Sequence, residues 1–331
     1  MRSTSAKSEM LGIKRAINKS ILVERVFEHM DKAIDNYFDR EGFVKVRAPF
    51  MSEGIGSCEN PKTLFGVDYL GKKTYLRQSA QLYLEMYMPA LTKVWCEGPS
   101  FRAEQKKDHR HLSEFNLYEF EFCGNFEQLL ILIENLFSEI IGHVHTHAEK
   151  QLLQLGVNID ELSSMKPPYP RVTYEKAVEV LGLEWGSDLR SEHEKALVKM
   201  YGFKPLFVML FPKQMKFFNM KVKQEDDSVV NSVDLILPFS GEAVGGAERE
   251  FHYDAVKERL LESAMLRIFK DRGVDIDSFE PYLNHLKTEG SVLHSGCGIG
   301  IERVLQFLIS SSNINDVMPL QFGSARSYPN G

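Results

Sequence analysis

Strand-like segments fill the middle of the chain, and long amphipathic helical patterns flank them without regular strand–helix alternation. The helical patterns cover residues 11–41 and 126–155, where apolar residues recur mostly at three- and four-residue spacing. Shorter β-type runs lie at residues 94–98, 100–104, 116–123, 206–211 and 229–237. A parallel sheet would need a long crossover between most of these strands. The order of elements therefore predicts an α+β fold, with an antiparallel β-sheet flanked by helices.

The positions of glycine and proline residues refine the expected boundaries of these elements. Residues 43–49 are expected as a strand stopped by Pro49, and residues 64–70 and 73–77 as paired strands around a turn. The glycine-rich run at 296–300 is expected to open a last helix that continues to Ser310. Residues 156–203, which begin with a proline-rich loop, are expected to form a peripheral insertion. We otherwise treat residues 1–331 as a single domain.

Composition excludes several classes of protein. The 331 residues carry 40 Lys and Arg against 46 Asp and Glu, so the net charge of −6 provides no global basic field for nucleic acid. With 43% hydrophobic and 26% charged residues, the chain is globular rather than disordered. Its start is polar and no apolar run approaches the ~20 residues that a membrane helix needs. These features predict a cytoplasmic protein with no membrane partner.

A charged loop between two predicted strands is the first candidate site. Phe101-Arg102-Ala103-Glu104 precedes it, and His111-Leu112-Ser113-Glu114-Phe115 follows it. One interpretation is a solvated hairpin tip. The other is a cationic hairpin over a polyphosphate, in which Arg102 supplies a donor fork and Phe115 a flat face for a base.

Two further stretches carry candidate chemistry. Glycines at 296, 298 and 300 allow a close backbone approach, and Arg303 follows at the start of the expected helix, where an arginine can meet an anion. Asp234 and Glu242 lie eight residues apart near a glycine turn. This carboxylate pair predicts a Mg²⁺ site, because Mg²⁺ favours carboxylate and phosphate oxygens; a solvated acidic loop is the alternative.

Taken together, these stretches resemble the class II aminoacyl-tRNA synthetase family, in its aspartyl and asparaginyl branch. Residues 42–49 resemble motif 1 of that family, residues 101–104 with 111–115 resemble motif 2, and residues 298–303 resemble motif 3. Residues 78–85 and 245–250 extend the likeness. The resemblance implies the class II catalytic fold, ATP and Mg²⁺ as cofactors, and a homodimer formed through the motif 1 region.

The resemblance also implies roles for individual residues. On the ATP side, Arg102 would contact the α-phosphate and Arg303 the γ-phosphate, and these two are the predicted catalytic residues. The other expected ATP and metal contacts are Phe115 and Glu104 with adenine, His111 with the β- and γ-phosphates, and Asp234 and Glu242 with Mg²⁺. On the amino-acid side, Glu59, Gln78, Ser79 and Gln81 would contact the reacting end of the substrate, and Arg249 the far end. Leu84 and Glu119 are also expected at this site, and both look like the residues of asparaginyl rather than aspartyl enzymes.

Departures from the family pattern shape the functional hypothesis. The family's OB-fold anticodon-binding domain is expected to be absent, because one helix and a short polar tail precede residue 43. The loop at residues 57–60 and the segment at 318–323 also differ from the family pattern. These departures argue against tRNA as the acceptor, whereas the expected ATP contacts are all present.

The leading hypothesis is an AMP-forming amide ligase that adenylates aspartate, through its β-carboxyl, and passes it to ammonia. Arg249 would then bind the α-carboxylate, and Glu119 the ammonium, of a reversed aspartate. Three alternatives stay open. The site would use another small amine in a biosynthetic pathway, charge tRNA, or bind an amino acid as a non-catalytic sensor.

Overall fold

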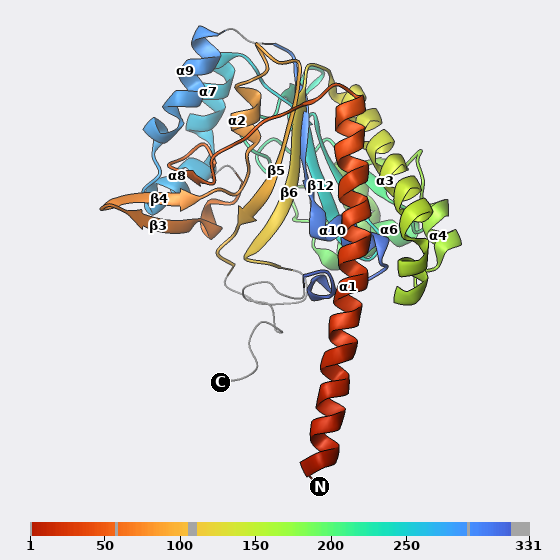
Figure 1. Ribbon diagram of the computed structural model, residues 1–331. Helices are drawn as coiled ribbons and strands as arrows, with labels where there is room; N and C mark the ends of the chain where they lie inside the picture. The colour runs from red at the N-terminus through yellow and green to blue at the C-terminus, as the bar shows by residue number, and fades with distance from the viewer. Residues whose placement is uncertain (1, 57–58, 105–110, 290–291, 319–331) are drawn as a thin grey trace.

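Eight strands form one sheet through the middle of the molecule (Figure 1). The computed structural model describes residues 2–56, 59–104, 111–289 and 292–318. In spatial order the strands are β1 (Val44–Lys45), β5 (Lys93–Phe101), β6 (Glu114–Phe122), β13 (Ser295–Gly300), β12 (Gly241–Glu248), β11 (Ser232–Leu237), β8 (Leu206–Met209) and β7 (Arg171–Thr173). The five inner pairings are antiparallel, while β1 pairs parallel with β5 and β7 parallel with β8. The predicted α+β fold is confirmed, although the sheet is mixed at its two edges.

Three helices cover one face of this sheet. They are α1 (Arg2–Arg40), α3 (Phe126–Leu155) and α10 (Ile301–Leu308), and their apolar sides share the largest hydrophobic core with strands β6, β11, β12 and β13. The sequence sets the ends of α3 clearly. Asn125 and Gln128 form a capping box at its start, and Gly156 ends it in the left-handed conformation, with φ 84°.

A second group of elements lies on the other side of the molecule, at the left of Figure 1. A small sheet of β2 (Met51–Ser52), β4 (Lys72–Leu76) and β3 (Phe65–Tyr69) contains the expected hairpin. The region expected as one helix over residues 253–271 forms two, α7 (Tyr253–Glu262) and α8 (Ala264–Arg272), and α9 (Glu280–Thr288) follows. These helices and the hairpin share a second apolar core.

Residues 156–203, expected as a peripheral insertion, add the edge strand β7 to the main sheet. They form α4 (Ile159–Ser164), β7, α5 (Tyr174–Leu181) and α6 (Ser191–Met200), and β7 extends the main sheet by pairing with β8. Val172 of β7 and Leu206 and Val208 of β8 pack into one apolar cluster with α5 and α6. The segment belongs to the sheet because this burial supplies the hydrophobic partner that its two short helices need.

The remaining elements are short. They are α2 (Gln81–Glu85), β9 (Val222–Lys223), β10 (Asp226–Val230) and the 3₁₀ turns η1 (Pro61–Thr63), η2 (Ile276–Phe279) and η3 (Ile314–Asp316). The strand expected over residues 43–49 pairs only at Val44–Lys45. In the part of the chain that the structure describes, no helix combines the length and apolar character required to cross a bilayer.

Candidate active site

A cavity of about 730 Å³ runs beside the central strands. Eight of the residues singled out from the sequence line it: Glu59, Arg102, Glu104, His111, Phe115, Asp234, Glu242 and Arg303. They come from sequence positions that span more than 200 residues, and the antiparallel sheet brings them together. The cavity wall also contains glycines of β12 and β13. The structure therefore gathers the three candidate stretches around one space.

The strands β5 and β6 position Arg102 and Phe115. Arg102 follows the last residue of β5, and its backbone N–H donates to the carbonyl of Ser113 at 2.9 Å, which continues the ladder. Its guanidinium lies 5.1 Å from the centre of the Phe115 ring and forms an ion pair with Glu59. Among the described residues, buried Arg102 Nε has no hydrogen-bond partner. Arg102 is thus held over the cavity with a donor left for a ligand.

The glycine-rich run is a strand rather than the start of a helix, which corrects our expectation for residues 296–310. Residues 295–300 form β13 at the centre of the sheet, and α10 begins only at Ile301. Alternation explains the composition, because Cys297 and Ile299 are fully buried on one face while the glycines face the other. A Cβ at Gly296 would lie 2.2 Å from the Phe120 carbonyl oxygen. Only glycine leaves room there for the Phe120 carbonyl and the Glu121 side chain of β6.

The turn from β13 into α10 fixes Arg303 at the cavity. Glu302 is buried and accepts hydrogen bonds from Asn116 of β6, at 3.0 Å from both the backbone N and Nδ2. Burial raises the pKa of Glu302 to about 7. Arg303 donates Nη1 to the Ser240 carbonyl at 2.6 Å and lines the cavity. The helix start is therefore bound to β6 and to the loop before β12.

Asp234 of β11 and Glu242 of β12 form a carboxylate pair. A Cβ on Gly245 would lie 3.5 Å from Glu242 Oε1 and 3.9 Å from Asp234 Oδ1, so both oxygens border the space that this glycine leaves open. Burial raises the pKa of Asp234 to about 7, and nearby Glu242 adds to that effect. The described residues contain no cluster of three metal-binding side chains. Two hard oxygen donors beside a cavity fit Mg²⁺, which takes its other ligands from water and phosphate.

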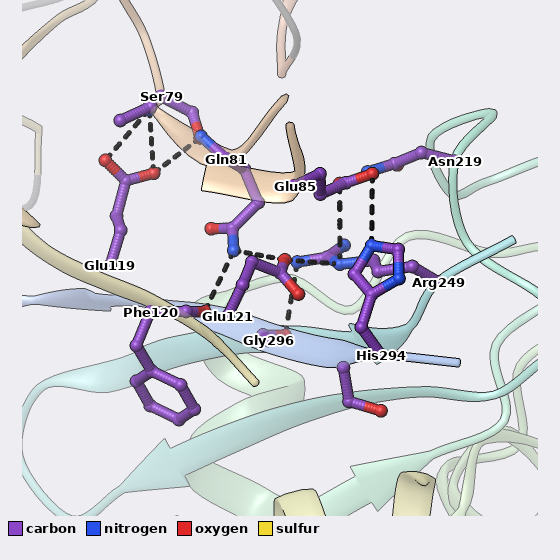
Figure 2. Close-up of polar contacts among 12 residues, drawn as sticks. Ser79, Gln81, Glu85, Glu119, Phe120, Glu121, Asn219, Arg249, His294 and Gly296 are labelled. Atoms are coloured by element: carbon purple, nitrogen blue, oxygen red, sulfur yellow. Dashed lines mark hydrogen bonds and ion pairs between the residues drawn. The ribbon is translucent and has the colours of Figure 1, made fainter. Parts of the chain in front are cut away.

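Beyond the cavity, β6 carries two acidic side chains on one face, Glu119 and Glu121. Figure 2 shows Glu119 opposite the start of α2, where it accepts hydrogen bonds from Ser79 Oγ at 2.5 Å and from the Ala80 N–H at 2.9 Å. Burial raises the pKa of Glu119 to about 7, although these two donors oppose the shift. Register places Glu119 opposite Gly298, which lines the cavity. Glu119 therefore lies next to the cavity wall.

Arg249 lies at the centre of a buried polar network (Figure 2). Its Nε donates to Glu121 Oε1 at 2.8 Å, and its Nη2 donates to the Gly296 carbonyl at 3.1 Å. Glu85 of α2 lies 3.7 Å from Arg249 Nε and accepts from Asn219 and Tyr282. Gln81 Nε2 donates to Glu121 Oε1 at 2.5 Å. Glu121 Oε2 is buried without a partner among the described residues.

Two of the residues predicted from the sequence, Gln78 and Leu84, do not line the cavity. Gln78 is fully buried and makes two backbone hydrogen bonds to Asn60, accepting at Oε1 and donating from Nε2, both at 2.9 Å, so it fixes the loop that carries Glu59. Leu84 is placed differently from our expectation. It is fully buried in an apolar cluster with Met88 and Val94, away from the cavity wall.

Sequence reasoning missed several wall residues. The segment from Asp188 to Glu194 lines the cavity although it belongs to the region that we expected to be peripheral. Lys216, between β8 and β9, lines it too and forms an ion pair with Asp234. Neither segment has a motif that would mark it. Only the sheet topology brings them to the site.

This chain matches the family model described as tRNA synthetases class II (D, K and N) over residues 2–322. The chain belongs to the class II tRNA synthetase family. The predicted membership in this family is therefore confirmed.

Individual relatives are consistent with this assignment. The asparagine–tRNA ligase of Pelotomaculum thermopropionicum is 35% identical over 321 residues, which cover 95% of this chain and 71% of that protein. The structure of asparaginyl-tRNA synthetase from Pyrococcus horikoshii complexed with asparaginyl-adenylate superposes with a TM-score of 0.86 at 32% identity, covering 94% of this chain and 70% of that one. The Entamoeba histolytica asparaginyl-tRNA synthetase complex with asparaginyl-adenylate gives 0.77 at 27% identity, covering 91% and 66%.

These relatives bear on the predicted function. They match over the catalytic fold and agree with a ligase of the aminoacyl-tRNA synthetase type. All three are named as asparagine–tRNA ligases or asparaginyl-tRNA synthetases, and none of the three is named as an ammonia-dependent asparagine synthetase. They give no support to the expectation that tRNA is not the acceptor. Among the hypotheses drawn from the sequence, they favour an asparaginyl adenylate-forming enzyme over ammonia-dependent asparagine synthesis.

Proposed function

We propose that this protein activates asparagine with ATP to form asparaginyl-adenylate and transfers the asparaginyl group to an acceptor. The observation that carries the proposal is the buried pair of Arg249 and Glu121. Arg249 Nη1 donates no hydrogen bond to a described residue, and Glu121 Oε2 is an unpaired acceptor beside it. A carboxamide matches this pair, because its carbonyl oxygen can accept from the guanidinium and its NH₂ group can donate to the carboxylate. A carboxylate would present a second negative charge to Glu121.

The cavity supplies the binding groups for ATP. Phe115 would stack against adenine, Glu104 would accept from its amino group, and Arg102 and His111 would contact the phosphates. Arg303 would bind the far phosphate from the start of α10. Asp234 and Glu242 would hold Mg²⁺, which neutralises phosphate charge when bound. Because Glu59 pairs with Arg102, the triphosphate must replace this carboxylate as the partner of the guanidinium.

The chemistry requires alignment and charge neutralisation more than covalent assistance. The α-carboxylate oxygen of asparagine forms a bond to the α-phosphorus, and the bond from that phosphorus to the bridging oxygen of pyrophosphate breaks. Pyrophosphate leaves with the electron pair. Arg102, placed at the α-phosphate, stabilises the charge that spreads over the phosphoryl oxygens. Glu119 would hold the ammonium of asparagine beside the reacting carboxylate.

We propose the 3′ end of a tRNA as the acceptor, because the relatives described above are named for that activity. A hydroxyl oxygen would attack the carbonyl carbon of the adenylate, and AMP would leave. The second candidate is the ammonia-dependent reaction with a reversed aspartate. The buried guanidinium of Arg249 keeps this candidate open, since it would pair with an α-carboxylate while Glu119 would accept the ammonium of the reversed aspartate.

Product analysis separates these candidates. The purified protein is incubated with ATP, Mg²⁺ and either asparagine with total tRNA or aspartate with ammonium. Our proposal predicts asparaginyl-tRNA in the first mixture and no asparagine in the second. Equimolar AMP and asparagine in the second mixture would establish the ammonia reaction instead.

The raised pKa of Glu119 predicts that asparagine affinity depends on pH. Glu119 has a folded pKa of about 7, above its usual value, so it is protonated below pH 7 and ionised above it. Only the ionised form attracts an ammonium. The dissociation constant for asparagine at pH 6 should therefore be about tenfold higher than at pH 8. Calorimetric titration measures this, and E119Q should bind weakly at both pH values. Equal wild-type affinities at pH 6 and 8 would refute this role.

Substituting Glu121 should change amino-acid preference. E121Q preserves shape but removes the charge that favours a carboxamide and repels a carboxylate. The asparagine-to-aspartate ratio of kcat/KM in pyrophosphate exchange should fall by about 10- to 100-fold. The matched control is E127Q, at an exposed glutamate that pairs with Arg171 on the surface. An unchanged ratio in E121Q would show that Glu121 does not read the substrate side chain.

A further inference from the structure

Lys216 lies in the cavity wall, and its ammonium forms an ion pair with Asp234, one of the two predicted metal-binding carboxylates. Its Nζ lies 2.7 Å from both Oδ1 and Oδ2 of Asp234. The same atom lies 3.9 Å from the centre of the Phe211 ring, which contacts it as a second favourable partner. The two charged side chains are 17% and 10% exposed. This is a largely buried pair, not a surface contact.

From this geometry we propose that Lys216 competes with a divalent cation for Asp234. An ammonium and a metal ion at the same two oxygens would repel each other strongly at this depth. A cation that coordinates Asp234 must therefore displace Lys216. The proposal rests on the adenylation site proposed above, because it assigns Asp234 and Glu242 to the metal that accompanies ATP.

The ion pair gives the site a stable charge balance. Lys216 neutralises Asp234, so that two adjacent carboxylates are not left uncompensated beside the cavity. The lysine stem is flexible, and Lys216 lies at a bend outside regular secondary structure. With ATP and its metal bound, Asp234 would hold the cation and the Lys216 ammonium would pair with a phosphate oxygen instead. We therefore expect the metal to bind well only together with ATP.

Manganese binding without nucleotide tests the proposal directly. Free and bound Mn²⁺ are quantified by electron paramagnetic resonance with the full-length protein, in the absence of ATP and amino acid. K216M removes the competing charge and should bind Mn²⁺ about tenfold more tightly than the wild type. Adding D234N to K216M should abolish that gain, whereas D234N alone should change wild-type binding by less than about twofold, because Lys216 already blocks Asp234.

Lys213 provides the matched control, since it lies on the same segment but not in the cavity wall. K213M should bind Mn²⁺ as the wild type does, and K216Q should repeat the K216M result if the methionine variant folds poorly. Equal or weaker Mn²⁺ binding in the Lys216 variants would overturn the proposal. The proposal would also be overturned if D234N weakened Mn²⁺ binding as much in the wild-type background as in the K216M background. No substrate is present in this test. The Mn²⁺ result can therefore contradict the role of Lys216 while asparagine activation is confirmed, and asparagine activation can fail while the role of Lys216 is confirmed.

Discussion

Replacing Arg102 with alanine is expected to lower asparagine-dependent pyrophosphate exchange by about 10³-fold or more, without unfolding the protein. The guanidinium lies over Phe115 at the cavity, and no described residue accepts from its Nε. It is the cation best placed to meet the charge that develops at the α-phosphorus. R102K should recover little of the activity, since lysine lacks the planar fork that binds two phosphate oxygens.

The control for this variant is R40A. Arg40 is an exposed arginine that pairs with Glu139 at 2.9 Å on the far side of the sheet. Its removal should leave the exchange rate unchanged and have little effect on stability, because exposed ion pairs contribute little. If R102A retains more than about a tenth of the wild-type rate while its circular dichroism is native, Arg102 is not the phosphate contact.

Replacing Arg249 with methionine is expected to give the largest loss of stability, about 3–5 kcal/mol. Arg249 is 3% exposed and lies between two fully buried or nearly buried glutamates, Glu85 and Glu121. Removing the cation leaves these carboxylates without their counter-charge. Gln81, Asn219 and Tyr282 are neutral donors, and His294, whose Nε2 lies 3.6 Å from Glu85 Oε2, supplies a positive charge only when it is protonated.

Urea unfolding measures this loss, and R249K separates stability from recognition. Lysine restores the charge, so R249K should regain part of the stability, but it should not restore asparagine binding because the second donor is missing. The exposed R40A variant again sets the scale for an ordinary salt bridge. An R249M protein as stable as the wild type would show that the buried glutamates are neutralised in another way.

Local sequence patterns predicted the elements whose ends are encoded nearby. Residues 126–155 form α3 as expected, because the Asn125 capping box and Gly156 mark both ends. The β-type run expected at residues 116–123 forms β6, which presents Glu119 and Glu121 on one face and Tyr118 and Phe120 on the other. The motif residues were predicted from resemblance, and the structure places eight of them around one cavity.

Features that depend on distant partners could not be predicted this way. The glycines of β13 resemble a helix-opening turn, and only the neighbouring side chains of β6 explain why a strand needs them. The segment at 156–203 contributes β7 through a pairing with β8 that no local pattern encodes. Leu84 is the expected type for its motif, but its environment depends on the packing of α2 against Val94. Lys216 belongs to no motif at all.

The most direct test of asparagine activation is a single-turnover reaction. The protein is mixed with ATP, Mg²⁺ and asparagine in excess over active sites and without an acceptor, quenched with acid and examined by mass spectrometry for the mixed anhydride of asparagine and AMP. We predict asparaginyl-adenylate in an amount close to that of active sites, and none with aspartate. An adenylate that forms with aspartate but not with asparagine, and yields free asparagine when ammonium is added, would contradict the proposed function.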